Sequence, residues 1–185
     1  MSRVLLLHGI HSAGRGGPGK FIPALQAAGH EIHPHDCSPY TLLATTWLRP
    51  NVDHERAREL VKLLAGERVH VIAHSNGCRL AALAMKEGAA FDTVIFFGAA
   101  WPAHAAYPEG AFTKLYMVYS KTDPAILIGS ALPRHEFGSA GRNGYRGLAD
   151  NRIVNVSATP HLHTTYFRWP WRDRWARWVV ERLAV

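Results

Sequence analysis

Cysteine is nearly absent from the 185-residue chain: Cys37 and Cys78 are the only two, and neither belongs to a C-x-x-C pair. This composition excludes a disulfide-stapled scaffold and a zinc ribbon. Long apolar runs are also missing. The first one, Val4 to Leu7, is shorter than a signal-peptide core, and no stretch approaches the roughly 20 apolar residues of a membrane span. We therefore expect a cytoplasmic protein without a membrane span.

Acidic residues are few: the chain has 14 Asp and Glu and 21 Lys and Arg, which gives a formal net charge of +7. The arginines are scattered, however, and the sequence has no basic arm, zinc finger or aromatic RNA-binding signature. We predict no specific nucleic-acid partner. With 48% hydrophobic and 19% charged residues and no linker-like stretch, residues 1–185 are predicted to form a single domain.

Apolar runs typical of buried strands alternate with helical patterns along the chain. Strands are predicted at residues 4–7, 31–35, 69–73, 93–97, 114–119 and 153–156, and helices at 18–28, 52–65, 79–86 and from 171 to the C-terminus. This alternation predicts an α/β fold with a doubly wound, mostly parallel sheet in a three-layer α/β/α sandwich. Residues 98–113 show no long helical pattern, so no large cap is expected.

A glycine-rich segment follows the first predicted strand. Gly14 to Lys20 fits G-x-x-x-x-G-K, the pattern of a phosphate-binding loop. Three features oppose that interpretation. The pattern begins several residues after the strand, Phe21 stands where Ser or Thr would bind magnesium, and Pro18 has no backbone N–H to offer a phosphate. We interpret the segment as a loop that leads to the first helix, and not as a nucleotide site.

The stretch VHVIAHSNGCRL, residues 69–80, joins a buried strand to a helix through a tight turn with Ser75 at its apex. Ala73 and Gly77 flank the serine, and small residues are what a strained turn between a strand and a helix requires. The pattern resembles the nucleophile elbow of the α/β-hydrolase superfamily, in the A-x-S-x-G form of small bacterial lipases. The alternative interpretation is an ordinary strand-to-helix turn with a capping serine.

The resemblance implies a chain order of Ser, then Asp or Glu, then His. Asp123 follows the predicted strand at 114–119, and His163 follows the last predicted strand. His161 is an alternative, but His163 begins HTTYF, and a small polar pair with an aromatic residue often follows the histidine of similar hydrolases. The resemblance therefore implies a catalytic triad of Ser75, Asp123 and His163.

The same resemblance implies an oxyanion hole formed by the backbone N–H groups of Asn76, in the elbow, and Ile10, after the first strand. It also implies a lidless serine esterase that forms an acyl-enzyme intermediate and needs no metal or organic cofactor. Residues that follow strand ends or the acid are candidates for the substrate pocket: His11, Tyr40, Trp101, Pro102, Ile126 and Leu127.

The substrate is expected to be a small or polymeric ester, and other activities stay open. The same residues would serve a thioesterase, an amidase or a lytic esterase of cell-envelope lipids, and the fold could carry a non-catalytic binding protein. The segment 124–152, rich in glycine and arginine, could dock a partner or an anionic substrate. The sequence gives no indication of the oligomeric state.

Two other clusters are interpreted as structural. The segment HEIHPHD, residues 30–36, has metal-binding side chains, but Pro34 disturbs the strand and no second cluster has ligand spacing, so no metal is predicted. Trp171, Trp175 and Trp178 recur at helical spacing. We expect this stripe to be the buried side of the last helix.

Overall fold

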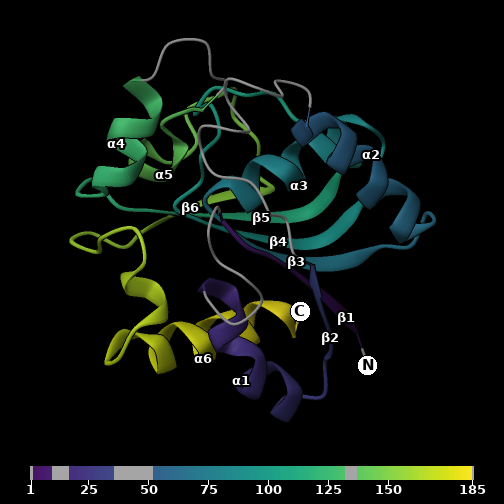
Figure 1. The fold of residues 1–185 in the computed structure, drawn as a ribbon, viewed down its shortest axis with the longest axis horizontal. Coiled ribbons are helices and arrows are strands. Elements are labelled where there is room, and N and C mark those ends of the chain that lie inside the picture. Colours follow the sequence, from purple (N-terminus) through teal and green to yellow (C-terminus); the bar gives the residue numbers. More distant parts are fainter. Residues whose placement is uncertain (1, 10–16, 36–51, 132–136, 185) are drawn as a thin grey trace.

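The structure is a computed structural model that describes residues 2–9, 17–35, 52–131 and 137–184. Its centre is a six-stranded sheet in the order β2-β1-β3-β4-β5-β6, in which every neighbouring pair is parallel (Figure 1). The strands are β1 (Arg3–Leu7), β2 (Glu31–His35), β3 (Val69–His74), β4 (Phe91–Phe97), β5 (Phe112–Tyr119) and β6 (Ile153–Ser157). The predicted α/β fold class is confirmed, and the sheet is parallel throughout.

Helices cover both faces of this sheet (Figure 1). On one side lie α1 (Ile22–Ala27) and α6 (Trp171–Leu183), and on the other lie α2 (Val52–Leu64), α3 (Asn76–Lys86), α4 (Pro124–Ala131) and α5 (Ala140–Asn143). Two 3-10 turns, η1 (Gly17–Phe21) and η3 (Thr165–Phe167), precede α1 and α6. None of the helices in the described ranges has both the length and the apolar character to cross a membrane.

The sheet separates two hydrophobic cores. Leu5 and Leu7 of β1 contribute to the core under α2 and α3, whereas Val4 and Leu6 contribute to the core under α1 and α6. Successive side chains of a strand point to opposite faces. Because helices cover both faces of the sheet, a central parallel strand is apolar at successive positions. This is why residues 4–7 of β1 form a continuous apolar run.

Two ion pairs join neighbouring elements in different surroundings. Arg79 of α3 donates from Nε to Oδ2 of Asp53 in α2 at 2.9 Å, and the two side chains are only 9% and 13% exposed. Arg68, before β3, contacts Asp92 of β4 at 3.1 Å, but these side chains are 41% and 43% exposed. Removing one partner of a shielded pair lowers the free energy of unfolding strongly, because the other charge stays buried without a partner. In an exposed pair the loss is small, because water replaces the missing partner.

Several elements differ from the prediction. The helix expected at 18–28 is divided between η1 and α1, α3 begins directly after Ser75, and the segment 124–152 contains α4 and α5. The sequence of α4, PAILIGSA, is apolar apart from Ser130, so no helical period marks it. Of the tryptophan stripe, Trp175 is buried as expected, but Trp171 is 36% exposed.

The direction of chain progression reverses between β1 and β3, because β2 lies on one side of β1 and β3 to β6 follow on the other. In open parallel sheets, ligands bind beyond the carboxyl ends of the strands at such a switch point. The register pairs Leu7 of β1 with Ala73 of β3. Two residues further along these chains are Gly9 and Ser75, so the fold brings the predicted nucleophile to the switch point.

Candidate active site

Ser75 forms the turn between β3 and α3. Its φ of 55° and ψ of −121° are a conformation that non-glycine residues rarely adopt. Its N–H donates to the carbonyl oxygen of Phe97 on β4 at 3.0 Å. On the other side, a Cβ at Gly77 would lie 2.5 Å from the carbonyl oxygen of Leu7. The serine is therefore presented by a strained turn that the neighbouring strands hold closely.

The segment that leaves β1 passes directly against this serine. A Cβ built on Gly9 would lie 2.9 Å from Cβ of Ser75, a separation that real side chains do not reach. The predicted residues Ile10, His11 and Tyr40 lie outside the described residues, so the second oxyanion donor and two of the pocket residues stay predictions.

Asp123, after β5, and His163, after β6, form a hydrogen-bonded pair. His163 Nδ1 donates to Oδ2 of Asp123 at 2.7 Å. Asp123 is fully buried, and its Oδ1 accepts hydrogen bonds from the backbone N–H groups of Ala125 and Ile126 at 3.0 and 3.2 Å. A carboxylate only accepts hydrogen bonds, so the proton of His163 lies on Nδ1 and its Nε2 is free to accept one.

Gly98, directly after β4, leaves the space that this pair occupies. Its φ is +53°, and a Cβ there would lie 3.2 Å from Oδ2 of Asp123 and 3.2 Å from Nδ1 of His163. Both the positive φ and the close approach favour glycine. The acid and the histidine therefore pack against bare backbone at the end of a central strand.

His74, the residue before Ser75, links the histidine segment to β3. This buried side chain donates from Nε2 to the carbonyl oxygen of His163 at 2.8 Å, and the centroids of the two rings are 4.5 Å apart. Burial, with a smaller contribution from the charge of His163, lowers the pKa of His74 to about 3. His74 is consequently neutral at pH 7, with its proton on Nε2.

The alternative histidine, His161, has a different environment. Its Nε2 accepts a hydrogen bond from Nε1 of Trp175 at 3.3 Å, and its ring stacks on Tyr166 with the centroids 5.5 Å apart. The hydrogen bond to Asp123 comes from His163 instead. The geometry thus pairs the acid with the preferred histidine of the two, while the catalytic role of the pair stays a prediction.

The other predicted residues occupy different environments. Asn76 is the first residue of α3, so its N–H has no acceptor within the helix. Trp101 is only 1% exposed and belongs to the core, and Pro102 follows it. Ile126 is buried beside the acid, whereas Leu127 is 50% exposed. Their roles in a substrate pocket stay predictions.

Sequence reasoning did not single out His74 or Gly98. The signal for His74 is a histidine that ends a fully buried strand, where a polar ring needs a specific partner. The signal for Gly98 is a glycine directly after the buried strand next to that of the serine. Both signals are weak alone, because each depends on which strands become neighbours.

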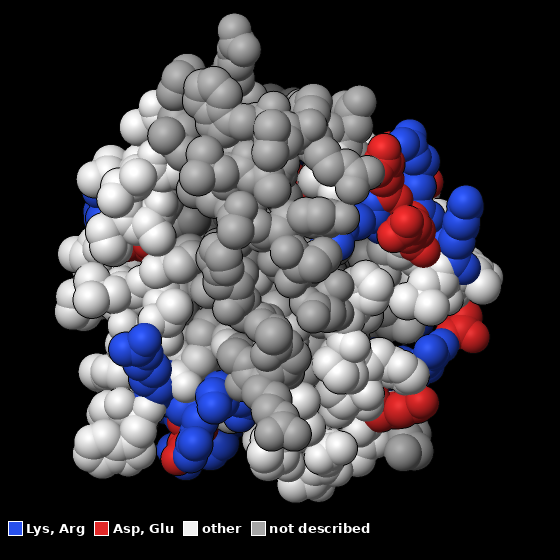
Figure 2. All heavy atoms as spheres, in the orientation of Figure 1, with Lys and Arg blue, Asp and Glu red and all other residues white. Residues whose placement is uncertain are grey.

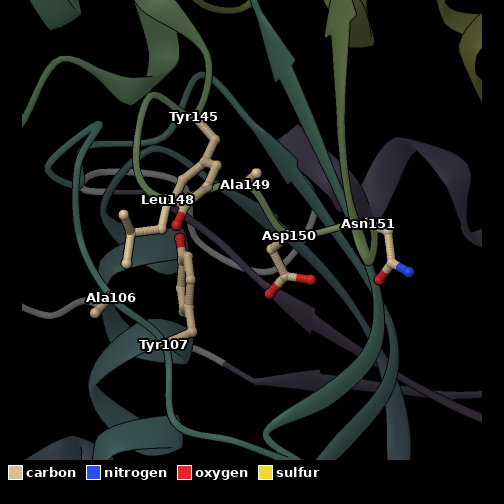
Figure 3. Close-up of a pocket in the computed structure, with 7 residues that line it drawn as sticks. All are labelled: Ala106, Tyr107, Tyr145, Leu148, Ala149, Asp150 and Asn151. Atoms are coloured by element: carbon tan, nitrogen blue, oxygen red, sulfur yellow. The ribbon is translucent and has the colours of Figure 1, made fainter.

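A metal centre and a surface hollow are the other possible sites. Within the described ranges, no group of three His, Cys, Asp or Glu side chains could hold a metal ion. A hollow of about 560 Å³ lies near the segments that enter β5 and β6. Figure 3 shows the hydroxyl groups of Tyr107 and Tyr145 pointing toward one another in this hollow. None of the predicted site residues lines it.

The parallel sheet, its strand order and the turn at Ser75 define an α/β-hydrolase-like fold, and comparison with solved structures agrees with this class. A Xanthomonas campestris structure described as a hydrolase of the α/β superfamily is 15% identical, with a TM-score of 0.58, and the match covers 100% of this chain and 99% of that one. The likeness therefore extends over the whole chain.

Other structural neighbours have more specific names. The esterase domain of a Rhodothermus marinus protein is 16% identical, with a TM-score of 0.58, over 98% of this chain and 84% of that one. A monoacylglycerol lipase from Paleococcus ferrophilus is 14% identical, with a TM-score of 0.64, over 97% and 92%. No family model and no curated protein sequence matches the chain. At these identities the likeness shows the fold alone.

Proposed function

We propose that the protein is a serine hydrolase of carboxylic esters, with Ser75 as nucleophile, His163 as general base and Asp123 as the carboxylate that orients the base. The observation that carries the proposal is the 2.7 Å hydrogen bond between His163 Nδ1 and a fully buried Asp123, at the sheet end where Ser75 occupies a strained turn. Esterases and a lipase among the structures of similar fold support an ester substrate.

In the proposed reaction, His163 Nε2 removes the hydroxyl proton of Ser75 while Oγ attacks the ester carbonyl carbon. The N–H groups of Asn76 and Ile10 receive the negative charge that develops on the carbonyl oxygen. When the bond to the alcohol oxygen breaks, the alcohol takes the proton from His163. A water molecule, deprotonated by the same nitrogen, then attacks the acyl-enzyme, and release of the acid restores Ser75.

The hydrogen-bond pattern supports these roles. Asp123 keeps the proton of His163 on Nδ1, so Nε2 has the lone pair that a general base needs. His74 stays neutral and donates to the His163 carbonyl, which fixes the segment without placing a second positive charge beside the base. The reaction needs no metal or organic cofactor.

The test is hydrolysis of p-nitrophenyl acetate, butyrate and octanoate by the wild type, Ser75→Ala and Ser130→Ala. We expect Ser75→Ala to lose at least about 10³-fold in kcat, because no other nucleophile replaces the hydroxyl. Ser130 is exposed on α4 and serves as the matched control with unchanged activity. A fluorophosphonate should label the wild type and Ser130→Ala but not Ser75→Ala.

The proposal fails if the folded wild type neither turns over these esters nor reacts with the fluorophosphonate. Labelling without ester turnover would instead indicate a reactive serine with another acyl substrate. Acetyl-thioester and anilide substrates of matched chain length then separate a thioesterase and an amidase from an esterase. The order of the three rates identifies the preferred bond.

A further inference from the structure

A pocket of about 300 Å³ lies between the end of β6 and the first half of α6. Its floor is formed by the chain from Val156 to His161, and its wall by one face of the helix. The side chains that give it chemical character are those of His161, Trp171, Arg174, Trp175 and Trp178. Ser75 and His163 are not among its lining residues.

The wall of this pocket is formed mainly by indole rings. Trp175 is 8% exposed, whereas Trp171 is 36% exposed and Trp178 is half-buried, so parts of two rings are uncovered. The Trp175 and Trp178 centroids are 5.4 Å apart at an interplanar angle of 76°, and His161 lies 4.6 Å from Trp171. Rings in this arrangement offer a face and an edge to a flat apolar group.

Arg174 supplies a cation to the same space. In the described part of the chain no carboxylate lies within ion-pair distance of its guanidinium. The adjacent Asp173 forms its ion pair with Arg172, at 2.7 Å. An arginine beside aromatic rings usually either stacks on them or holds an anion in its planar fork. Here the described rings include none on which Arg174 is stacked, which leaves its donors available.

His161 is the other polar side chain of the pocket. Its Nε2 accepts the hydrogen bond of the Trp175 indole, and burial lowers its pKa, so the neutral ring carries its proton on Nδ1. This N–H is directed to the backbone carbonyl oxygen of Ala158, which lines the same pocket. His161 therefore adds a polar ring to the pocket, and Arg174 supplies the charge that would attract a carboxylate and repel a cation.

The surrounding charge also favours an anion. Arg168, Arg172, Arg174 and Arg177 stand on or just before the first two turns of α6, against a single acidic residue, Asp173. Figure 2 shows Lys and Arg side chains gathered where α6 begins in Figure 1. A positive potential of this kind raises the local concentration of small anions.

We propose that this pocket binds a small aromatic carboxylate, with its ring against the indoles and its carboxylate on Arg174. The volume is at the lower end of the range for small-molecule sites, which suits one or two rings. An aliphatic acid would leave the indole faces without a partner, and a neutral arene would leave the guanidinium without one. The inference does not depend on the proposed function.

The test uses the full chain, labelled with ¹⁵N, and follows the six tryptophan indole N–H signals by NMR during titration with 2-naphthoate. The Trp171, Trp175 and Trp178 signals, assigned by single Trp→Phe variants, should shift saturably, while that of the buried core residue Trp101 should not. The same titration with 2-naphthamide and with acetate separates the contribution of the charge from that of the ring.

Arg174→Gln should weaken naphthoate binding at least about tenfold, because it removes a charge-assisted hydrogen bond. Arg177 is exposed on the same helix but does not line the pocket, so Arg177→Gln is the matched control and should leave the affinity unchanged. Naphthamide should bind at least about tenfold more weakly than naphthoate, and acetate should not shift the three signals.

Three results would overturn the inference. One is the absence of any shift at millimolar naphthoate. Another is equal affinity of wild type and Arg174→Gln, which would place the ligand elsewhere. The third is equal weakening by Arg174→Gln and Arg177→Gln, which would reduce the effect to the general positive charge of the helix. A loss confined to Arg174→Gln, with preference for the carboxylate over the amide, supports it.

Discussion

Replacement of Asp123 by asparagine tests the proposed triad most sharply, because it keeps the size of the side chain and removes its charge. In the wild type, Oδ1 of Asp123 accepts two backbone N–H groups and Oδ2 accepts the proton of His163 Nδ1. The two amides will retain the carbonyl oxygen of the asparagine. Its NH2 group is then directed at His163 Nδ1, which must become an acceptor.

This reversal moves the proton of His163 to Nε2, where it blocks removal of the Ser75 proton. For the corresponding change in a Ser-His-Asp triad, the loss in kcat is about 10⁴-fold, which is about 5.5 kcal/mol of barrier at 1.36 kcal/mol per tenfold. We expect a loss of 10³- to 10⁴-fold in Asp123→Asn, with KM changed only a few-fold.

The assay is the steady-state hydrolysis of p-nitrophenyl butyrate at pH 7.5, with circular dichroism to confirm that the variant is folded. Asp92→Asn is the matched control, because Asp92 is an exposed acid at the start of β4 and should retain wild-type kcat. A folded Asp123→Asn variant with kcat within tenfold of the wild type would refute the tautomer argument and the proposed role of the carboxylate.

Three stability predictions are tested by chemical denaturation. The folded-state pKa of His74, about 3, lies below its unfolded value of 6.5. As the pH falls from about 6.5 toward 3, the unfolded state therefore takes up a proton that the folded state does not, and the free energy of unfolding decreases. Acidification from pH 7.5 to 5 should therefore cost the wild type about 2 kcal/mol more than His74→Gln, and equal losses would contradict the burial argument. Gly77→Ala should lower the free energy of unfolding by about 3 kcal/mol, because its Cβ would meet backbone, while Gly129→Ala, with open space around it, should change it by less than about 1. Asp53→Ala should cost about 3 kcal/mol and Asp92→Ala less than about 1, and similar values for the two would show that shielding of the ion pair is irrelevant.

Much of the fold follows from local patterns in the sequence. The central strands are recognisable because both of their faces are buried, and the run from Val4 to Leu7 therefore has no polar position. The α4 helix was missed for the opposite reason: its exposed residues, such as Leu127 and Ile128, are as apolar as its buried Ile126. Where burial and hydrophobicity do not coincide, periodicity carries no signal.

Some residues of the candidate site can also be predicted from local sequence, and others cannot. Ser75, Asp123 and His163 each follow an apolar run, and parallel strands bring such positions to one edge, so chain order alone indicates the group. The contacts of His74 and Gly98 depend on how the segments after β5 and β6 fold back over the end of the sheet. Their partners are 89 residues away for His74, and 25 and 65 residues away for Gly98 (123 − 98 and 163 − 98). Local sequence cannot specify such contacts.

The hydrogen bond from His74 to the His163 carbonyl has a consequence for how activity responds to heat. The histidine segment follows β6, which is an edge strand, and sheet edges open at lower free energy than central strands. His74, however, ends the central strand β3 and is covalently joined to Ser75. If β6 frays, the base remains attached to the strand that carries the nucleophile. We expect thermal inactivation to follow melting of the sheet centre and not the earlier loosening of its edge.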